Sequence, residues 1–455
     1  MAEFKLKRGY NLKIAGKADK TLSELELPKK VAVQPNEFRG VKPKLSVAVG
    51  DKVNIGTALF EDKLIPELKF VSPVSGEVKE INRGARRALL EIVVENDHKD
   101  TKETVGSWSA EDLKNLKRDQ IIEALLKGGM WPHLIQRPFS RIANPGTTPR
   151  DIFISAMDTS PLAADPNFII EGLEKEFQAG IDILKKLTDG TVYLSLQNKN
   201  ENSPVYENAS GVEINKFSGP HPVGNVGVQI HHIKAIKRGD IVWYIKPYAV
   251  ALIGKFFGQG FFQRDRVVAT AGSSLTKRQY FKTIVGTPVA ALIPENIVAD
   301  DEVRYISGNV LSGRKISSAG YVSYYDNLIT AIPEGKKQRS FLEYLVPGFK
   351  TPSFSKTFLS NFIAPTKTDY VLDTRMKGGH RAFVATGDYE RVLPMDIYPV
   401  YLMKSILADD IEEMEGLGIL ELDEEDIALC TYICLSKTDF GGILRSGLNL
   451  IEKEG

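Results

Sequence analysis

Cys430 and Cys434 are the only thiols in the 455 residues of the chain. An iron–sulfur cluster needs a thiolate at each corner, and a structural zinc ion needs four ligands, so two thiols complete neither site alone. No histidine stands at a zinc-ligand spacing from them. Because cysteine otherwise behaves as a small apolar side chain, the pair predicts two thiols buried on a helix, with no metal bound.

Histidines are the other candidate ligand-binding groups. His221, His231 and His232 fall in the Gly- and Pro-rich run 219–232, where a loop can present imidazoles to a ligand. We expect His231 and His232 at the end of a strand, where successive side chains point to opposite faces, so that only one of them lines a given pocket. A structural role and a ligand-facing role both stay open for these residues.

Asp158 is positioned by the elements predicted around it. The apolar runs 151–155 and 191–195 have strand length, and a helical face lies between them, with Asp165 as N-cap and Pro166 at the first helical position. This strand–helix–strand unit predicts parallel strands joined by a right-handed crossover. Asp158 then lies at the carboxyl edge of the sheet, where such sheets bind ligands. Two interpretations of Asp158 are equally open: it binds a ligand, or it keeps an inherited position that no longer does so.

An acidic run precedes the cysteines. Its members are Glu421, Asp423, Glu424, Glu425 and Asp426. Carboxylates in the first turn of a helix complement the helix dipole. The run therefore predicts a solvated helix start.

The overall charge balance excludes one class of partner. Lys and Arg total 59 and Asp and Glu total 58, and a net charge of +1 gives no long-range attraction to nucleic acid. The most apolar stretch, 248–262, contains Lys255 and three glycines and is too short to cross a bilayer. Residues 1–20 lack the continuous apolar core of a secretory signal. We therefore expect no transmembrane helix and no signal peptide.

Turn chemistry and hydrophobic periodicity divide the chain into four units. Residues 1–100 have the pattern of short strands, 101–262 alternate strands and helices, 263–332 form a small mixed β segment, and 333–455 are helical. Three helices are expected in the last unit, over 396–407, 423–434 and 441–453. The predicted fold class is multidomain, with α/β and β units and a helical C-terminal region.

The first unit resembles a biotinyl/lipoyl-type barrel-sandwich hybrid. Segments 47–60 (VAVGDKVNIGTALF) and 70–78 (FVSPVSGEV) match the two halves of that pattern. Carriers of this family hold a modified lysine on the hairpin between the halves. The nearest candidate here is Lys63, which lacks the sequence context of such lysines. We therefore expect a rigid docking barrel that carries no group.

Across nearly its whole length the chain resembles the A subunit of the sodium-translocating NADH:quinone reductases. The likeness is carried by 9–16 (GYNLKIAG), 156–166 (AMDTSPLAADP), 219–232 (GPHPVGNVGVQIHH) and 420–430 (LELDEEDIALC). The layout is also similar to the C subunit of the Rnf complex and to the NADH-binding subunit of complex I. The resemblance implies a Rossmann-like α/β unit, a β-grasp-like (SLBB) unit and a C-terminal region with a degenerate ferredoxin-like motif.

Departures from these relatives indicate lost redox sites. Complex I-type subunits bind nucleotide phosphates on a glycine-rich loop, because only Gly lets the backbone approach closely enough. The corresponding segment 127–133 (KGGMWPH) has two glycines followed by Met, Trp and Pro, which crowd that approach. Rnf-type subunits hold clusters with C-x2-C-x2-C-x3-C-P, of which only Cys430 and Cys434 remain. We expect neither flavin nor an iron–sulfur cluster in this chain.

The resemblance also implies a function and partners. The chain would be a peripheral subunit on the cytoplasmic side of a bacterial inner membrane, supporting ubiquinone reduction coupled to sodium export. Its partners would be the other subunits of the complex, chiefly the membrane-embedded B subunit, with the region after Pro333 as the docking surface. Ubiquinone is the one expected ligand. Candidate quinone-site residues are Asp158, His221, His231, Phe257 and Phe261, although core packing is the alternative for the two aromatic residues.

Two other functions remain as alternatives. A free-standing flavin-dependent NADH dehydrogenase requires a phosphate-cradling loop, and a biotin or lipoyl carrier requires a modifiable hairpin lysine. NADH oxidation by the isolated chain would indicate the first, and a mass above the unmodified value would indicate the second.

Overall fold

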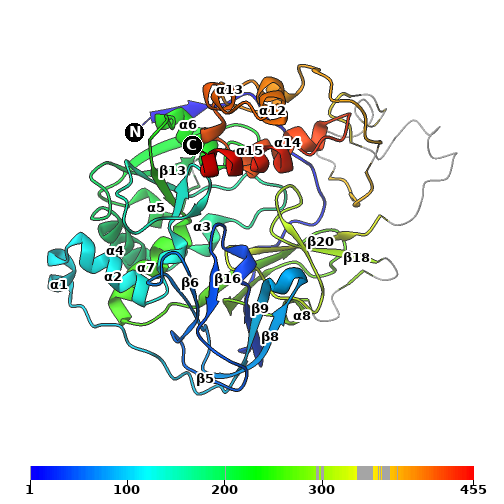
Figure 1. The fold of residues 1–455 in the computed structure, drawn as a ribbon. Coiled ribbons are helices and arrows are strands. Elements are labelled where there is room, and N and C mark those ends of the chain that lie inside the picture. Colours follow the sequence, from blue (N-terminus) through cyan, green and yellow to red (C-terminus); the bar gives the residue numbers. More distant parts are fainter. Residues whose placement is uncertain are drawn as a thin grey trace.

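The computed structural model describes residues 2–199, 201–293, 297–298, 302–335, 352–356, 358, 360, 369–376 and 378–454. The elements form four groups, with the barrel at the bottom of Figure 1, the α/β unit at the left, the third unit at the right and the C-terminal helices at the top. The predicted fold class is confirmed.

The barrel consists of two small antiparallel sheets, with strand orders β3-β9-β8-β5 and β4-β6-β7. Its strands are β3 (Lys30–Val33), β4 (Pro43–Leu45), β5 (Lys52–Val53), β6 (Ala58–Asp62), β7 (Lys69–Val71), β8 (Gly76–Arg83) and β9 (Leu89–Asn96). Two short 3-10 turns, η1 (Pro35–Glu37) and η2 (Ala85–Arg87), connect them. Val31, Leu59, Val78 and Val94 are fully buried between the sheets. Their removal from water holds the two sheets together.

A seven-stranded sheet with order β1-β14-β13-β12-β15-β10-β11 forms the α/β unit. Its strands are β1 (Ala2–Lys5), β10 (Ile135–Arg137), β11 (Arg141–Ile142), β12 (Ile152–Ser155), β13 (Val192–Gln197), β14 (Glu213–Ser218) and β15 (Val242–Ile245). Its helical segments are α1 (Ala110–Asn115), α2 (Arg118–Lys127), η3 (Trp131–His133), α3 (Pro166–Ile169), α4 (Glu174–Leu184), α5 (Pro204–Glu207), α6 (Val226–Lys234) and α7 (Pro247–Gln259). β12 and β13 pair in parallel, which confirms the predicted strand–helix–strand unit.

The helix between these two strands differs from the prediction in one respect. Asp165 caps α3, accepting a hydrogen bond from the backbone N–H of Asn167 at 3.0 Å, and Pro166 is the first helical residue, as predicted. The single expected helix is divided, however, because Gly172 has a φ of +79° between α3 and α4. α4 then packs on α7 at close range, where a side chain at Gly180 or Gly254 would overlap the backbone of the facing helix.

The first residues of the chain lie outside the barrel in which the boundaries 1–100 would place them. β1 pairs with β14 of the α/β sheet. β2 (Leu22–Glu24) pairs with β17 (Tyr280–Ile284) of the third unit. The N-terminal segment thus joins the second and third units before the barrel begins.

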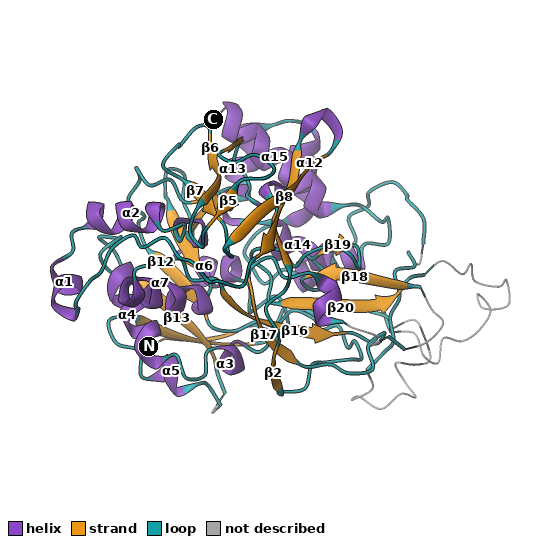
Figure 2. Ribbon diagram, turned by 90° about the horizontal axis from the view of Figure 1, so that it is seen from below, coloured by secondary structure: helices purple, strands orange, loops and turns teal. Residues whose placement is uncertain are grey.

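The third unit is a six-stranded sheet with order β19-β18-β20-β16-β17-β2. Its other elements are β16 (Asp265–Ala271), α8 (Val289–Leu292), β18 (Val303–Ser307), β19 (Arg314–Ile316) and β20 (Leu328–Pro333). Figure 2 shows β16, β18 and β20 together on the side of the molecule away from α1 and α2.

The C-terminal unit is helical, as predicted. Its elements are α11 (Tyr389–Val392), α12 (Pro399–Leu407), α13 (Ile411–Gly416), η4 (Ile419–Glu421), α14 (Glu424–Ile433) and α15 (Phe440–Glu454). They enclose a separate apolar core that includes Leu402, Met414 and Leu444. Within the described part of the chain, no helix combines the length and apolarity that a bilayer crossing requires.

Candidate functional site

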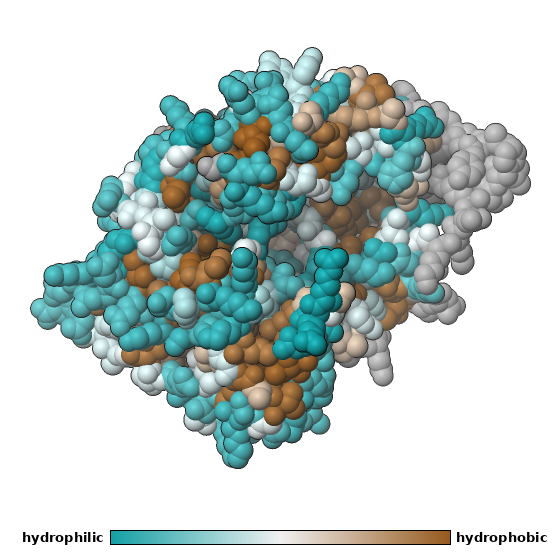
Figure 3. Space-filling model, viewed as in Figure 1, coloured by the Kyte–Doolittle hydropathy of each residue, from teal (hydrophilic) through white to brown (hydrophobic). Residues whose placement is uncertain are grey.

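A cavity of about 620 Å³ lies where the four units meet. Figure 3 shows the molecular surface hollowed in this central region, with apolar surface inside the hollow. The barrel contributes Glu37 and Arg39, the third unit contributes Arg314 among others, and α14 contributes Glu425. No single unit could form this cavity alone.

The floor of the cavity is the switch point of the parallel sheet. β12 pairs in parallel with β13 on one side and with β15 on the other. The strand order reverses between β12 and β15, because the chain adds β13 and β14 on one side of β12 and then places β15 on the other side. In open α/β sheets a crevice opens at the carboxyl ends of two such strands. Ser155 and Asp158 follow β12, and Ile245 and Lys246 follow β15, and all four line the cavity. This is the place where open α/β sheets bind ligands.

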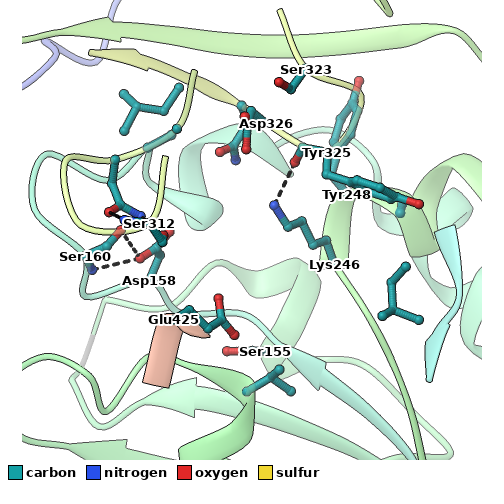
Figure 4. Close-up of a pocket in the computed structure, with 18 of the residues that line it drawn as sticks. Ser155, Asp158, Ser160, Lys246, Tyr248, Ser312, Ser323, Tyr325, Asp326 and Glu425 are labelled. Carbon is teal, nitrogen blue, oxygen red and sulfur yellow. Dashed lines mark hydrogen bonds between the residues drawn. The ribbon is translucent and has the colours of Figure 1, made fainter. Parts of the chain in front are cut away.

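The walls combine apolar surface with many polar and charged side chains. Ile169, Tyr248 and Leu252 provide apolar and aromatic surface. Figure 4 shows Lys246 and Asp158 around the cavity, with the Lys246 ammonium donating a hydrogen bond of 2.7 Å to the backbone oxygen of Tyr325. Burial raises the pKa of Tyr248 to about 12, and the charge of Arg266 opposes this rise, so its phenol stays protonated at neutral pH. The cavity thus offers both a neutral and a charged hydrogen-bond donor.

The loop after β12 differs from a phosphate-binding loop. Residues 156–165 contain no glycine, and the helix that follows, α3, has only four residues. The N-terminus of α3 is occupied by the Asp165 carboxylate, which is also paired with the Lys20 ammonium at 2.7 Å. A carboxylate at this point repels a phosphate rather than attracting one.

The two glycines of segment 127–133 allow close contacts between neighbouring elements. A Cβ atom at Gly128 would overlap the ring of Phe256, and one at Gly129 would lie 2.5 Å from Val71. Trp131 is fully buried and donates a hydrogen bond of 2.8 Å to the backbone oxygen of Ala143. Gly128 therefore allows close packing on α7 within the α/β unit, and Gly129 lets the barrel approach that unit closely.

Two of the predicted quinone-site residues lie together at the cavity. Asp158 accepts hydrogen bonds from Ser160, 2.8 Å from the backbone N–H and 2.6 Å from the hydroxyl. His221 lies 3.2 Å from the Thr159 hydroxyl through its Nδ1 atom. Burial lowers the pKa of His221 to about 4, although the Asp158 carboxylate opposes this shift. The imidazole is thus neutral at physiological pH.

His231 does not line the cavity, and its predicted position at a strand end is wrong. Residues 226–234 form α6, which begins after the N-cap residue Asn225, although the alternating Val226, Val228 and Ile230 fit a strand equally well. His231 donates from Nδ1 to a Glu421 carboxylate oxygen at 2.8 Å and accepts through Nε2 from the backbone N–H of Asp396 at 3.1 Å. This histidine connects α6 to the C-terminal unit.

Three more residues singled out from the sequence pack against other parts of the protein, away from the cavity. His232 donates from Nε2 to the backbone oxygen of Pro394 at 2.8 Å. The ring of Phe257 is fully buried, 4.9 Å from the ring of Trp108 between centroids. The ring of Phe261 lies under the Lys102 ammonium, 4.1 Å from its centroid. None of the three lines the cavity.

The acidic run begins a helix, as predicted, but its expected solvation is wrong, because Asp423 and Asp426 are buried and the other three residues are half-buried. The guanidinium of Arg137 is fully buried and lies 2.8 Å from the Asp426 carboxylate and 3.2 Å from the Glu425 carboxyl group. Asp423 is paired with Arg39 at 3.1 Å and with Arg445 at 2.6 Å. The acidic side chains therefore meet arginines from three other parts of the fold, which the sequence places far from them.

The buried charges shift the pKa values of this cluster in opposite directions. Burial raises the pKa of Glu425 to about 8; the charge of Asp426 adds to the rise and that of Arg137 opposes it. Burial also disfavours the charge of Asp423, but the hydrogen bond with Glu424 and the charges of Arg137 and Arg39 hold its pKa below the usual range. Glu425 has 39% of its side chain exposed, and it lines the cavity.

Both cysteines are fully buried, as predicted. Cys430 lies in α14, and burial raises the pKa of its thiol far above the usual range. Cys434 follows this helix, with its sulfur 3.2 Å from the Tyr389 hydroxyl. Among the described residues, no three His, Cys, Asp or Glu side chains are grouped so that they could hold a metal ion.

Sequence reasoning missed several residues of the cavity wall. Glu37, Lys246, Tyr248 and Arg314 line it but stand in no recognisable motif. Lys246 could have been found, because it follows the apolar run 242–245, and the rule that identified Asp158 applies to any parallel strand. Tyr248, two residues further on, follows from the same rule, whereas Glu37 and Arg314 reach the cavity only through packing between units.

Comparisons with known proteins agree with this architecture. Residues 4–97 match the NqrA N-terminal barrel-sandwich hybrid domain, 116–262 the NqrA second alpha/beta domain and 267–318 the NQRA C-terminal domain. Among solved structures, a chain of an NAD+-reducing [NiFe]-hydrogenase aligns with a TM-score of 0.41 and 9% identity, over 75% of this chain and 62% of that one. A likeness at that level says little about this protein.

Curated relatives match over the full length. The A subunit of the Na(+)-translocating NADH-quinone reductase of Yersinia pseudotuberculosis serotype O:1b is 39% identical over 99% of this chain and 100% of its own length. The same subunit of Pasteurella multocida is 38% identical, with 99% of both chains covered. The chain belongs to the NqrA family, the A subunits of the Na(+)-translocating NADH-quinone reductases.

Proposed function

We propose that this chain, as the A subunit of a sodium-translocating NADH:quinone reductase, binds the ubiquinone headgroup in the switch-point cavity and docks on the membrane-embedded B subunit through its C-terminal unit. In this proposal the chain shapes the quinone site and carries no electrons. It sits peripherally on the cytoplasmic side of the membrane, and the redox centres lie in the other subunits.

The observation that carries the proposal is the composition of the cavity. A quinone headgroup is flat, apolar and uncharged, and its two carbonyl oxygens accept hydrogen bonds, so it needs an apolar slot with one or two donors. Tyr248 and Leu252 provide such a surface, and the Lys246 ammonium and the Tyr248 hydroxyl are donors at the same place. The cavity volume of about 620 Å³ is in the range of small-molecule sites.

The same position favours a quinone over a dinucleotide. A dinucleotide carries two phosphates, which need close backbone N–H groups and a helix N-terminus free of negative charge. The Asp165 carboxylate occupies the N-terminus of α3, and the Asp158 carboxylate lines the cavity itself. An uncharged ligand experiences no such repulsion.

Equilibrium titration of the purified full-length chain with a short-chain ubiquinone tests the cavity assignment. Replacing the donor by Lys246→Met should weaken binding about tenfold or more, because a hydrogen bond from a charged donor contributes about 1.5–3 kcal/mol. Lys237→Met is the matched control, since Lys237 is exposed and outside the cavity. Equal binding by both variants, or no saturable binding by the parent chain, would reject the assignment.

The docking proposal rests on exposed aromatic surface of α12. Tyr398 and Tyr401 are 58% and 64% exposed, with ring centroids 6.2 Å apart, and Leu407 is 61% exposed. Exposed aromatic side chains grouped in this way are typical anchors of protein interfaces.

Co-purification with the membrane subunits tests the docking surface. The double variant Tyr398→Ser, Tyr401→Ser should lose most of the retained B subunit, while Tyr305→Ser, a partly exposed tyrosine of β18, should retain it. Normal assembly of the double variant would exclude α12 as the docking surface.

A further inference from the structure

The end of the barrel carries a second, cationic pocket. It has a volume of about 400 Å³ and is lined by Pro43, Lys44, Leu45, Lys63, Arg83, Arg87, Ala88 and Leu89. All four charged side chains in this lining are positive, and no carboxylate is among the lining residues. A pocket of this kind attracts an anionic group.

Two loops bring these charges together. Lys63 follows β6 at the start of the hairpin to β7, and Arg83 ends β8 before the turn η2. Arg83 donates a hydrogen bond of 3.1 Å to the backbone oxygen of Arg87, which holds the turn closed. Arg86 and Arg87 both have positive φ values, 54° and 60°, so the tight turn presents two adjacent guanidinium groups.

Most of these cations are uncompensated. Lys44 is paired with Glu61 at 2.8 Å. Among the described residues, no ion pair joins Lys63, Arg83, Arg86 or Arg87 to a carboxylate, although Lys30 and Lys79 form ion pairs elsewhere on this barrel. Since like charges close together repel one another, an external anion bound here would relieve this repulsion.

Exposed leucines stand directly beside the cations. Leu64 follows Lys63 and is 64% exposed, and Leu90, next to the pocket residue Leu89, is 39% exposed. Leu90 lies over Gly84, whose Cβ position would be 3.1 Å from the leucine side chain. Basic and apolar side chains side by side are the combination by which proteins bind the surface of an anionic bilayer.

We infer that the barrel end binds the anionic headgroups of the membrane. Lys63, Arg83 and Arg87 contact lipid phosphates, and Leu64 and Leu90 enter the interface between headgroups and acyl chains. The barrel hairpin, which in carrier proteins presents a modified lysine, here serves as a second, lipid-mediated attachment beside the contact with the membrane subunits. This attachment is independent of quinone binding in the cavity.

Vesicle flotation of the purified full-length chain tests the inference. The probes are vesicles of phosphatidylcholine alone and vesicles in which about a third of the lipid is phosphatidylglycerol. The parent chain should float with the anionic vesicles only, and raising the salt concentration should release it, because the attraction is screened over a Debye length. Binding to both vesicle types alike, or to neither, would overturn the inference.

The variant Lys63→Gln, Arg87→Gln removes two cations from the pocket. Because each basic residue near an anionic surface strengthens binding about fivefold, the variant should bind the anionic vesicles about 30-fold more weakly. The control Lys175→Gln, Lys199→Gln removes the same charge from exposed positions elsewhere and should bind like the parent. Equal weakening in both would show a general charge effect and would contradict a local site.

Two further measurements separate the remaining outcomes. Circular dichroism and ubiquinone titration of the pocket variant should match the parent, which distinguishes loss of lipid binding from misfolding and from failure of the quinone proposal. If the variant floats normally but fails to assemble with detergent-solubilised partner subunits, the pocket binds an acidic protein segment, and the lipid assignment is wrong.

Discussion

Arg137 places a positive charge where its side chain has no exposure to solvent. Removing an ion from water costs several kcal/mol, and the cost is recovered only when partners surround the charge. Here Asp426 and Glu425 supply carboxyl oxygens, and the backbone oxygen of Glu421 accepts a third hydrogen bond at 3.3 Å. The arginine thus connects β10 to the start of α14, at the wall of the cavity.

Replacing this arginine should be strongly destabilising. Arg137→Met removes the cation but leaves the Asp426 carboxylate fully buried, which we expect to lower the free energy of unfolding by about 3–5 kcal/mol. Urea-induced unfolding followed by circular dichroism measures the change. Arg238→Met is the control, because its ion pair with Glu415 is on the surface and contributes at most about 1 kcal/mol. Similar losses in both variants would contradict the buried-cluster interpretation.

Glu425 should make stability depend on pH. Its folded pKa of about 8 lies above the value of about 4.3 expected in the unfolded chain, so the folded state holds an extra proton between these two pH values. Stability contributed by the protonated group is present at low pH and is lost as the pH rises through 8.

Glu425→Gln removes this titration. The stability of the variant relative to the parent should therefore increase from pH 5 to pH 8, as measured by urea midpoints at matched ionic strength. A difference that stays constant or decreases over this interval would show that Glu425 is already ionised at low pH in the folded chain.

At the scale of elements, α6 approaches the buried cluster more closely than a helix with ordinary side chains could. A Cβ atom at Gly227 would overlap the Asp426 carboxylate and lie 2.7 Å from Nη1 of Arg137. The Asn225 side chain, at the N-cap of α6, donates a hydrogen bond of 2.9 Å to the backbone oxygen of Glu425. The glycine is thus required for contact between α6 and α14.

Two glycine-to-alanine variants should shift stability in opposite directions. In a free helix, Gly→Ala stabilises by about 0.8–1 kcal/mol. Gly258→Ala in α7 should show that gain, because nothing lies within 4 Å of its added methyl group. Gly227→Ala should instead destabilise by about 1–3 kcal/mol, because neither the carboxylate nor the guanidinium can move away without losing its partner. Stabilisation by both variants would refute the close contact.

Periodicity and turn chemistry identified many elements but not their long-range partners. The strands at 151–155 and 191–195, the cap at Asp165 and the C-terminal helices follow from local pattern, and they are present. α6 was missed because alternation of valines with small and polar residues fits a strand as well as a short helix. The sequence could not predict that β1 belongs to the α/β sheet, because a four-residue strand carries no information about its distant partner.

The candidate site was predictable only where it follows from topology. Asp158 was found because it follows a parallel strand, and His221 because its loop is rich in Gly and Pro. The burial of the acidic run depends on Arg39 and Arg137, which reach it through packing between units, and on Arg445 of α15. From local sequence alone, the simplest interpretation of a run of charges is a solvated helix start. Only the assembled fold shows that these charges are paired with arginines.

At the scale of the whole molecule, the cavity depends on every unit. Glu37 and Arg314 form an ion pair of 2.5 Å between the barrel and the third unit, and Arg39 joins the barrel to α14. Burial raises the pKa of Glu37 to about 7, against the hydrogen bond from the backbone of Tyr324 and the charge of Arg314. The cavity wall is thus formed by contacts between units and not by a loop of a single unit.

Breaking one of these contacts should weaken both the fold and ligand binding. Arg314→Gln removes the charge that joins the third unit to the barrel, at a side chain that is 40% exposed. We expect the free energy of unfolding to fall by about 1–3 kcal/mol, because the Glu37 side chain is only 7% exposed and loses its charged partner. We also expect a several-fold weaker affinity for ubiquinone, because the wall loses its fixed position. Titration and urea unfolding of the same variant measure both effects, and unchanged affinity would show that this wall does not contact the ligand.

The central claim is that the switch-point cavity holds the quinone headgroup. Photolabelling of the assembled reductase with an azido-ubiquinone, followed by peptide mass spectrometry of this subunit, tests it most directly. The label should appear on the segments that follow β12 and β15, around Asp158 and around Lys246 to Tyr248, and excess unlabelled ubiquinone should suppress it. Label confined to other subunits, or to surface peptides of this chain outside the cavity, would contradict the claim.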